Sequence, residues 1–241
     1  MTPALHYYFT MKFSQILTNI LFPRRCAGCS KKLGSGVVCN GCFGRIPVNK
    51  TLFCGVCNAR LPGTSKICHP KSPALFGAAG FYDEPTIKAL IHNLKFRNMR
   101  EAAQPLAELV EKFLTTSDVV RMTTLDVVIP VPLSRERLLA RGYNQAELIA
   151  ERLAEKISLP LAADLLIKIR HSKPQSETKD IYERRANLAG CFHVPNPVAV
   201  AGRRILLVDD VTTSGTTFME AAGALKKAGA RRIIAVAAAK A

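Results

Sequence analysis

The sequence lacks the features of several common classes of protein. None of its apolar runs approaches the about eighteen residues of a membrane-spanning helix, so we expect no stable membrane insertion. It contains no Gly-x4-Gly-Lys-Ser/Thr loop, which excludes an ATP-driven motor of the P-loop class. The N-terminus has neither the basic start nor the long apolar core of a secretory signal, which predicts a cytoplasmic protein. Met11 is a second candidate start, so whether residues 1–10 are native stays open.

Acidic residues are absent from one long stretch. The chain has 241 residues and a formal net charge of +16, because 34 Lys and Arg outnumber 18 Asp and Glu. Between Arg24 and Lys71 there are nine basic residues and no acid. A bias confined to one segment favours a polyanionic partner such as nucleic acid, with a role in solubility as the alternative. Aromatic side chains that could stack on bases are few there, and Phe43 and Phe53 could equally fill a small core.

Cysteines are nearly confined to the same stretch. Seven of the eight lie in it, and six of these form pairs with Cys-x-x-Cys spacing. That spacing is typical of metal knuckles in a reducing compartment rather than of disulfides. The first two pairs are nine residues apart and can supply four thiolates to one structural zinc ion. The predicted ligands are Cys26, Cys29, Cys39 and Cys42.

A second metal site is left open by the remaining cysteines. Cys54 and Cys57 form a third pair, but Cys68 has no paired cysteine and is followed by His69. A second zinc ion would therefore need His69 or water as its fourth ligand. The alternatives are a half-site that holds no metal and an arrangement in which the two clusters share ligands.

Beyond the cysteine-rich stretch, apolar runs alternate with helical patterns. We predict strands over 75–82, 127–131, 165–169, 205–208 and 233–238, and helices over 85–96, 101–114, 144–157 and 216–228. This alternation indicates a parallel sheet, and the continuous apolar runs indicate that helices cover both of its faces. The expected organisation is an α/β protein in three parts. These are an N-terminal extension with a short amphipathic helix (1–23), a small metal-binding module (24–73) and an α/β domain (74–241).

The most specific motif follows the strand predicted over 205–208. Asp209 and Asp210 come directly after four apolar residues, and a hydroxyl-rich bend with one glycine then leads into a helix. Backbone N–H groups at a helix N-terminus bind phosphate. Paired acids can accept hydrogen bonds from sugar hydroxyls or hold a divalent metal. The pattern therefore predicts a site for a phosphorylated ribose, with phosphate-binding residues Thr212, Thr213, Ser214, Gly215, Thr216 and Thr217.

A second candidate anion-binding element follows the strand predicted over 127–131. Arg135, Arg137 and Arg141 lie close together in what we predict to be a loop. Arginines bind phosphate and pyrophosphate with paired donors, and ligand crevices of parallel sheets lie at the carboxyl ends of the strands. The arginines and the acids should therefore share one pocket. Asn144 is the expected N-cap of the next helix.

The segment around Asp209 resembles the phosphoribosyl pyrophosphate (PRPP) motif of type I phosphoribosyltransferases. From about Phe13 onward the whole sequence resembles the ComF family of competence-associated proteins, in five motifs that keep the family's order. These are the cysteine knuckles, 94–96, 131–146, 184–187 and the PRPP motif. The departure is at Cys68 and His69, where the family has another cysteine pair, and it puts only the second zinc in question.

The resemblance implies a zinc ribbon joined to a phosphoribosyltransferase-like domain of type I. It implies that Asp209 and Asp210 meet the ribose hydroxyls and Mg²⁺, that the hydroxyl-rich bend wraps the 5′-phosphate, and that Zn²⁺ is structural. It also implies a cytoplasmic protein that binds PRPP and single-stranded DNA and acts in DNA uptake or use, with DNA-uptake or recombination proteins as further partners.

An enzyme that transfers phosphoribose from PRPP to a nucleobase-like acceptor is the alternative. Such an enzyme needs an acceptor pocket, usually with an apolar or aromatic hood, and the sequence shows none after its last strand. No catalytic residue is therefore assigned, and whether any transfer occurs stays open.

Overall fold

The computed structural model describes residues 23–57, 59–61, 69, 72–117, 124–169 and 190–241. The amphipathic helix predicted near the N-terminus, the family motif over 184–187 and Cys68 lie outside these residues. Within the described part, the main element is a six-stranded sheet with the strand order β2-β1-β3-β8-β7-β4.

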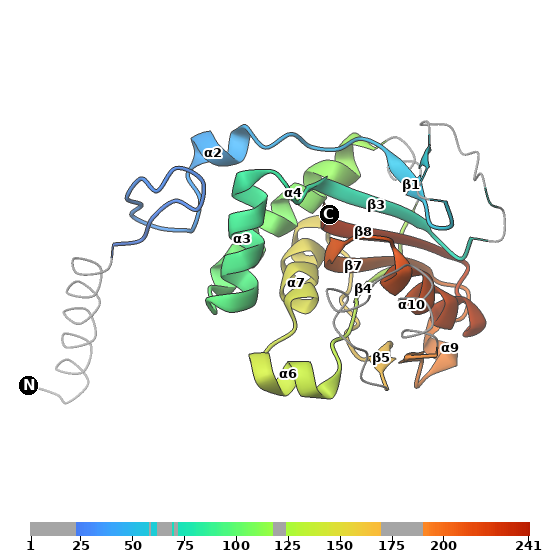
Figure 1. Ribbon diagram of the computed structural model, residues 1–241. Coiled ribbons are helices and arrows are strands. Elements are labelled where there is room, and N and C mark those ends of the chain that lie inside the picture. The colour runs from blue at the N-terminus through green and yellow to red at the C-terminus, as the bar shows by residue number, and fades with distance from the viewer. Residues whose placement is uncertain (1–22, 58, 62–68, 70–71, 118–123, 170–189) are drawn as a thin grey trace, which may run out of the picture.

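Four neighbouring strands of this sheet are parallel, and the last of them, β4, forms one edge (Figure 1). They are β3 (Leu75–Phe81), β8 (Arg232–Lys240), β7 (Arg204–Thr212) and β4 (Val127–Pro130), and each pairs in parallel with the next in this order. The predicted parallel sheet is therefore confirmed for four of the five predicted strands. The strand predicted over 165–169 is wrong for this sheet, because only residues 167 and 168 form a strand, and it pairs antiparallel in a separate sheet. β7 is longer than the predicted strand over 205–208, because its polar end stays paired with β8 as far as Thr212 opposite Lys240.

Two short strands from the cysteine-rich stretch extend the sheet. β1 (Leu52–Cys54) pairs antiparallel with β3, and β2 (Arg60–Leu61) pairs antiparallel with β1. All three residues of β1 are buried. Part of the segment assigned to the metal-binding module thus forms the edge of the α/β sheet, and the division at residue 73 stays a prediction.

Helices cover both faces of the sheet. The helices of one face are α3 (Pro85–Phe96), α4 (Ala103–Thr116, after the 3-10 turn η1, Arg100–Ala102) and α7 (Gln145–Ile157), and α10 (Thr216–Lys227) lies on the other. Alternate residues of β7 point to the two cores, since Leu206 and Val208 join the first and Ile205 and Leu207 the second. Burial on both faces explains why the strand is continuously apolar.

Local sequence chemistry sets the helix starts. Glu84 caps α3 by accepting a hydrogen bond from Ile87 N at 2.7 Å, and Pro85 occupies the first turn. Asn144 caps α7 as predicted, with Oδ1 accepting from Ala146 N at 3.1 Å. The four helices predicted beyond the cysteines agree with the structure to within two residues at each end.

The remaining elements are short. They are α2 (Asn40–Gly44), α6 (Arg135–Arg141), β5 (Ile167–Lys168), β6 (Phe192–His193) and α9 (Pro197–Val200). β5 and β6 pair antiparallel in a separate two-stranded sheet. Across the described ranges, no helix combines the length and the hydropathy needed to cross a bilayer.

Candidate functional site

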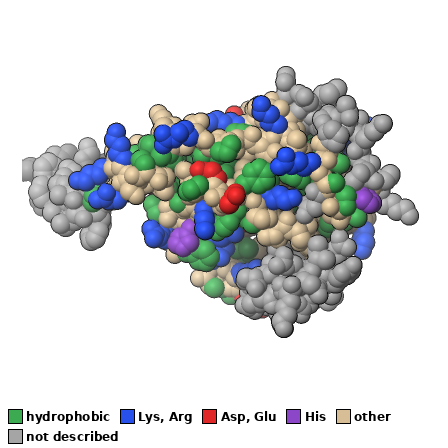
Figure 2. All heavy atoms as spheres, turned by 45° about the horizontal axis from the view of Figure 1, so that its top comes forward, with side chains coloured by type: hydrophobic (Ala, Val, Ile, Leu, Met, Phe, Trp, Pro, Cys, Tyr) green, Lys and Arg blue, Asp and Glu red, His purple; other side chains and the backbone are tan. Residues whose placement is uncertain are grey.

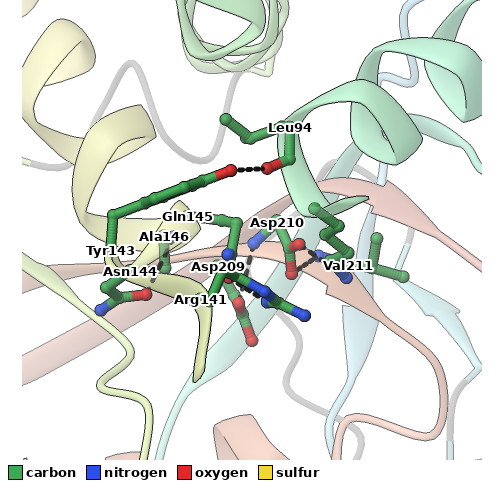
Figure 3. A network of polar contacts seen from close by, with 10 residues as sticks. Leu94, Arg141, Tyr143, Asn144, Gln145, Ala146, Asp209, Asp210 and Val211 are labelled. Atoms are coloured by element: carbon green, nitrogen blue, oxygen red, sulfur yellow. Dashed lines mark hydrogen bonds and ion pairs between the residues drawn. The ribbon is translucent and has the colours of Figure 1, made fainter. Parts of the chain in front are cut away.

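Two acids stand at the carboxyl end of β7. Asp209 is half-buried, and Asp210 is 7% exposed. Asp209 Oδ1 accepts a hydrogen bond from Asp210 N at 2.8 Å, and Asp210 Oδ1 accepts one from Val211 N at the same distance. These bonds hold both carboxylates at the edge of the sheet, as Figure 3 shows.

A lysine from another element neutralises this pair in part. Lys95, in the last turn of α3, places Nζ 2.6 Å from Asp210 Oδ2. The contact is an ion pair rather than an aligned hydrogen bond, since Asp210 Oδ2 has no hydrogen-bond partner among the described residues. Burial and the charge of Asp210 raise the pKa of the Asp209 carboxyl well above its usual range, and Lys95 opposes this shift. An acidic pair that is only partly neutralised suits a cation or hydroxyl donors.

The first residue of α7 adds a donor without a partner. Gln145 is 2% exposed, and its Oε1 accepts a hydrogen bond from Arg141 Nη1 at 2.5 Å. Its Nε2 is buried and bonds to none of the described residues. Figure 3 shows Gln145 and Arg141 in the same network view as Asp209 and Asp210. A buried amide N–H is costly unless something accepts from it, so this position fits an oxygen-rich ligand.

The three arginines lie on a helix, so the predicted loop is wrong. Arg135, Arg137 and Arg141 belong to α6, which buries none of its side chains. Arg and Leu are good helix formers, and Gly142 ends the helix in the left-handed region with φ 78°. Arg137 and Arg141, four residues apart, share one side of α6, which Arg135 does not.

Lys168 of β5 responds to charges from both α6 and β7. Burial lowers the pKa of Lys168 and the charge of Arg137 lowers it further, while Cys191 and, to a smaller extent, Asp209 oppose this shift. Arg137 and Asp209 thus both act on the same lysine, and the pocket shared by the arginines and the acids stays a prediction.

The hydroxyl-rich bend carries β7 directly into α10. Ser214 Oγ and Thr216 Oγ1 lie 2.8 Å apart. Gly215 has φ 76°, and a Cβ there would approach the ring of Phe76 to 2.9 Å, so only glycine fits. Unlike α3 and α7, α10 begins without a side-chain cap. A helix that opens in this way presents its N-terminal dipole to an anion.

Sequence reasoning did not assign Lys95, Gln145 or Lys168 to this site. Gln145 adjoins the predicted cap Asn144, and its position before a helix gave no sign that its amide is buried. Lys95 and Lys168 come from a helix and a strand whose packing no local pattern reveals.

Four cysteines meet at the start of the described chain. The sulfur atoms of Cys26, Cys29, Cys39 and Cys42 all lie within 4.8 Å of one another. Burial disfavours the Cys26 thiolate, but backbone N–H bonds, including those from Gly28 at 3.4 Å and Cys39 at 3.3 Å, outweigh it and lower its pKa to about 6. Four sulfurs at this spacing suit a structural zinc ion.

This cysteine knuckle (residues 24–45) contacts η1 and α4, and its Gly28 lies near Thr86 of α3. Arg24 Nη1 lies 2.6 Å from Glu101 Oε2, and Lys112 Nζ lies 4.1 Å from the ring centre of Phe43. A Cβ at Gly28 would approach Cys42 Sγ to 2.9 Å, so this tight turn needs a glycine for space. A groove of about 720 Å³ between the knuckle and α4 lies away from the acids and forms no part of their site.

The third cysteine pair also gathers ligands. Cys54, Cys57 and His69 each bring one ligand atom within 4.8 Å of the others, and Cys54 Sγ lies 3.3 Å from His69 Nδ1. Phe53 beside them is buried under Lys240, whose Nζ lies 4.0 Å from the ring centre. Phe53 is thus a core residue and offers no face to a base.

Two family profiles match the chain. The profile of the phosphoribosyl transferase domain matches residues 143–241, and that of the double zinc ribbon domain matches residues 17–70. The first contains the acids and the hydroxyl-rich bend, and the second contains all three cysteine pairs. The predicted fold class, a phosphoribosyltransferase-like α/β domain after a zinc ribbon, is confirmed.

Relatives cover most of the chain. Competence protein F of Haemophilus influenzae is 31% identical over 214 residues, which are 86% of each of the two chains. DNA utilization protein YhgH of Escherichia coli O157:H7 is 31% identical over 210 residues, 83% of this chain and 89% of that one. Competence protein ComFC of Bacillus subtilis is 36% identical over 103 residues, 43% of this chain and 39% of that one.

Proposed function

The chain belongs to the ComF family, and on this premise we propose that it binds PRPP and single-stranded DNA and acts in the uptake or use of incoming DNA. The names of its relatives, which refer to competence and DNA utilization, support this role. The proposed place of action is the cytoplasm, and the proposed protein partners belong to the DNA-uptake or recombination machinery.

The observation that carries the PRPP part is a pair of acids joined by a short bend to an uncapped helix. The ribose hydroxyls would donate to the carboxylates of Asp209 and Asp210. The 5′-phosphate would lie at the N-terminus of α10, beside the hydroxyls of Ser214 and Thr216. These groups belong to one continuous segment, so the strand and the bend fix their spacing. Thr212, Thr213, Gly215 and Thr217 complete the proposed 5′-phosphate site.

The pyrophosphate of PRPP would face α6 and the start of α7. Arg137 and Arg141, with Arg135 from the same helix, would supply positive charge, and the unpartnered Nε2 of Gln145 would donate to a phosphate oxygen. Mg²⁺ prefers carboxylate and phosphate oxygens, which the acids and this ligand offer together. The ion would contribute charge neutralisation at the pyrophosphate.

Zinc is proposed to hold the basic stretch in shape. The four sulfurs of the cysteine knuckle would bind one ion, and Cys54, Cys57 and His69 would bind a second, with Cys68 as the remaining candidate ligand. Figure 2 shows Lys and Arg side chains spread over one face of the molecule, with few acids among them. With the net charge of +16, this surface favours binding to the phosphates of DNA.

The test is a calorimetric titration of the protein with PRPP and Mg²⁺, with and without single-stranded DNA and nucleobases. We expect saturable binding of PRPP, binding of DNA that weakens steeply with salt, and no release of pyrophosphate. Absence of PRPP binding would contradict the proposed site, and a flat salt response would contradict the electrostatic contact with DNA. Pyrophosphate release that depends on a nucleobase would establish the transferase alternative instead.

A further inference from the structure

An exposed aromatic ring lies next to the proposed phosphosugar site. Phe96 ends α3 and is 67% exposed, and it directly follows Lys95, whose Nζ pairs with Asp210. The ring of His92, one helical turn earlier, lies 5.1 Å from the ring of Phe96, centre to centre. The guanidinium of Arg141 lies 5.9 Å from the same ring centre. His92 and Arg141 thus flank a phenyl ring whose residue is largely exposed to solvent.

The core does not account for this exposure. Phe53, Phe76 and Phe218 are buried. Among the described residues, several large hydrophobic side chains are exposed, and Phe96 is the one aromatic residue among them. Leu138 and Leu139 of α6 are exposed too, and Leu138 precedes Arg141 by one helical turn. The contact of Arg141 with Phe96 brings α6 close to the end of α3, and exposed apolar side chains that gather on one surface commonly mark a binding site.

Charge decides which partner suits this surface. Arg97, the C-cap residue of α3, is exposed directly after Phe96, and Arg141 of α6 lies near the ring. A predominantly basic rim around an aromatic ring is complementary to a single nucleic-acid strand, whose bases stack on aromatic faces while its phosphates meet arginines. An apolar protein partner would leave the arginines buried without acids to pair with.

We propose that Phe96 is a stacking platform for an unpaired base of single-stranded DNA, and that the exposed Arg97 contacts the phosphate beside it. The proposal rests on the DNA-binding function above and names the residues that recognise the strand. Because Lys95 and Phe96 are consecutive, the base and the phosphosugar would bind to the same end of α3. Phe96 also supplies the aromatic surface that the sequence did not reveal.

The experiment measures binding of an oligothymidylate and of an abasic strand of equal length to four full-length proteins. These are the wild type, Phe96→Leu, Phe96→Trp and, as a control at another exposed apolar position, Val198→Ala. The Leu variant keeps an apolar side chain but removes the π face. The affinity of each protein for PRPP is also measured by calorimetry, which tests the phosphosugar site separately.

We expect the wild type to prefer the strand with bases over the abasic strand. Phe96→Leu should lose that preference, with about a tenfold loss of affinity for oligothymidylate. Phe96→Trp and Val198→Ala should keep it, and PRPP affinity should be the same in all four proteins. Phe96→Leu with an unchanged preference would overturn the stacking site while leaving DNA binding intact. A wild type that binds neither strand would overturn both the DNA-binding function and the stacking site, and the PRPP titration would still test the acids.

Discussion

The cysteine knuckle and the junction of β7 with α10 are both short, dense motifs, but different forces hold them in place. The knuckle contributes few apolar residues to the core, with Val37 buried and Ala27, Val38 and Phe43 partly buried, and its centre is four sulfur atoms. The junction continues a strand whose residues Ile205 and Val208 are fully buried between β4 and β8. A metal should therefore organise the first motif, while the sheet organises the second. Replacing the cysteine ligands should therefore unfold the knuckle, whereas replacing the acids should leave the junction folded.

The largest effect is expected from Cys39→Ser combined with Cys42→Ser. The protein should lose one zinc ion per chain, and the knuckle should become susceptible to proteolysis while the sheet persists. Zinc binding contributes roughly 10–16 kcal/mol to the folding of isolated zinc fingers, so no substitution at the junction should match this loss. Metal analysis and limited proteolysis measure both effects.

Cys191→Ser is the matched control, because Cys191 is a buried cysteine that lies far from both clusters in the sequence. It should retain the full zinc content. A double variant with normal metal content and an intact knuckle would show that packing on α3 and α4, and not metal, holds the motif.

Asp209→Asn should weaken PRPP binding about 10- to 100-fold, because it removes charged hydrogen-bond acceptors that contribute about 1.5–3 kcal/mol. The free energy of unfolding of this variant should increase. The pKa of Asp209 is raised in the folded state, so its ionised form costs stability at neutral pH, and the amide removes that cost. Calorimetry and thermal melts give the two quantities, and Asp164→Asn at an exposed site should change neither. A variant that melts well below the wild type would mean that the acid supports the fold.

Lys95→Met should shift the pH dependence of PRPP binding. Binding needs the ionised carboxylate of Asp209, so affinity is full above the raised pKa of that carboxyl and is lost as pH falls through it. Without Lys95 the pKa of Asp209 should rise further, which moves the midpoint of that loss upward by about one pH unit. A series of titrations across pH measures this midpoint, and Lys95→Arg should restore it. Identical midpoints in the wild type and Lys95→Met would mean that the ion pair does not act on the acids.

The smallest effect is expected at the opposite end of β7. Arg204 Nε donates to Asp126 Oδ2 at 2.9 Å, and this hydrogen bonding lowers the pKa of Asp126 from 3.8 to about 2. The stabilisation is present above the unfolded value and is lost as pH falls through the folded value. Asp126→Asn should therefore flatten the acid dependence of stability below about pH 4. Denaturant melts at acid pH measure it, and PRPP binding at neutral pH should not change.

Much of the sheet and its helices could be predicted from the sequence, because their signals are local. The strands are continuous apolar runs, and the helices have apolar residues at helical spacing. The apolar run before Asp209 and the cap at Asn144 are examples, and both are confirmed. The strand β1 was not foreseen, because its sequence lies between two cysteine pairs and is stabilised by pairing with β3. The strand predicted over 205–208 ended too early for a similar reason, because pairing with β8 extends β7 through the acids despite their weak strand propensity.

Only those parts of the candidate site that are neighbours in the sequence could be predicted. The acids and the bend are neighbours in sequence, whereas Lys95 meets Asp210 through the packing of α3 against the sheet. The loop predicted around Arg137 was wrong, because the preceding prolines and the charge of the segment hid a short helix of good helix formers. The exposure of Phe96 follows from where α3 ends, which the apolar pattern of that helix does not reveal.

A crystal structure of the protein soaked with PRPP and Mg²⁺ tests the central claim most directly. We predict density for the ribose hydroxyls at the carboxylates of Asp209 and Asp210, with the 5′-phosphate against the first turn of α10. Ligand density at another place, or none at a concentration that saturates the protein in solution, would contradict the assignment of this junction as the phosphosugar site.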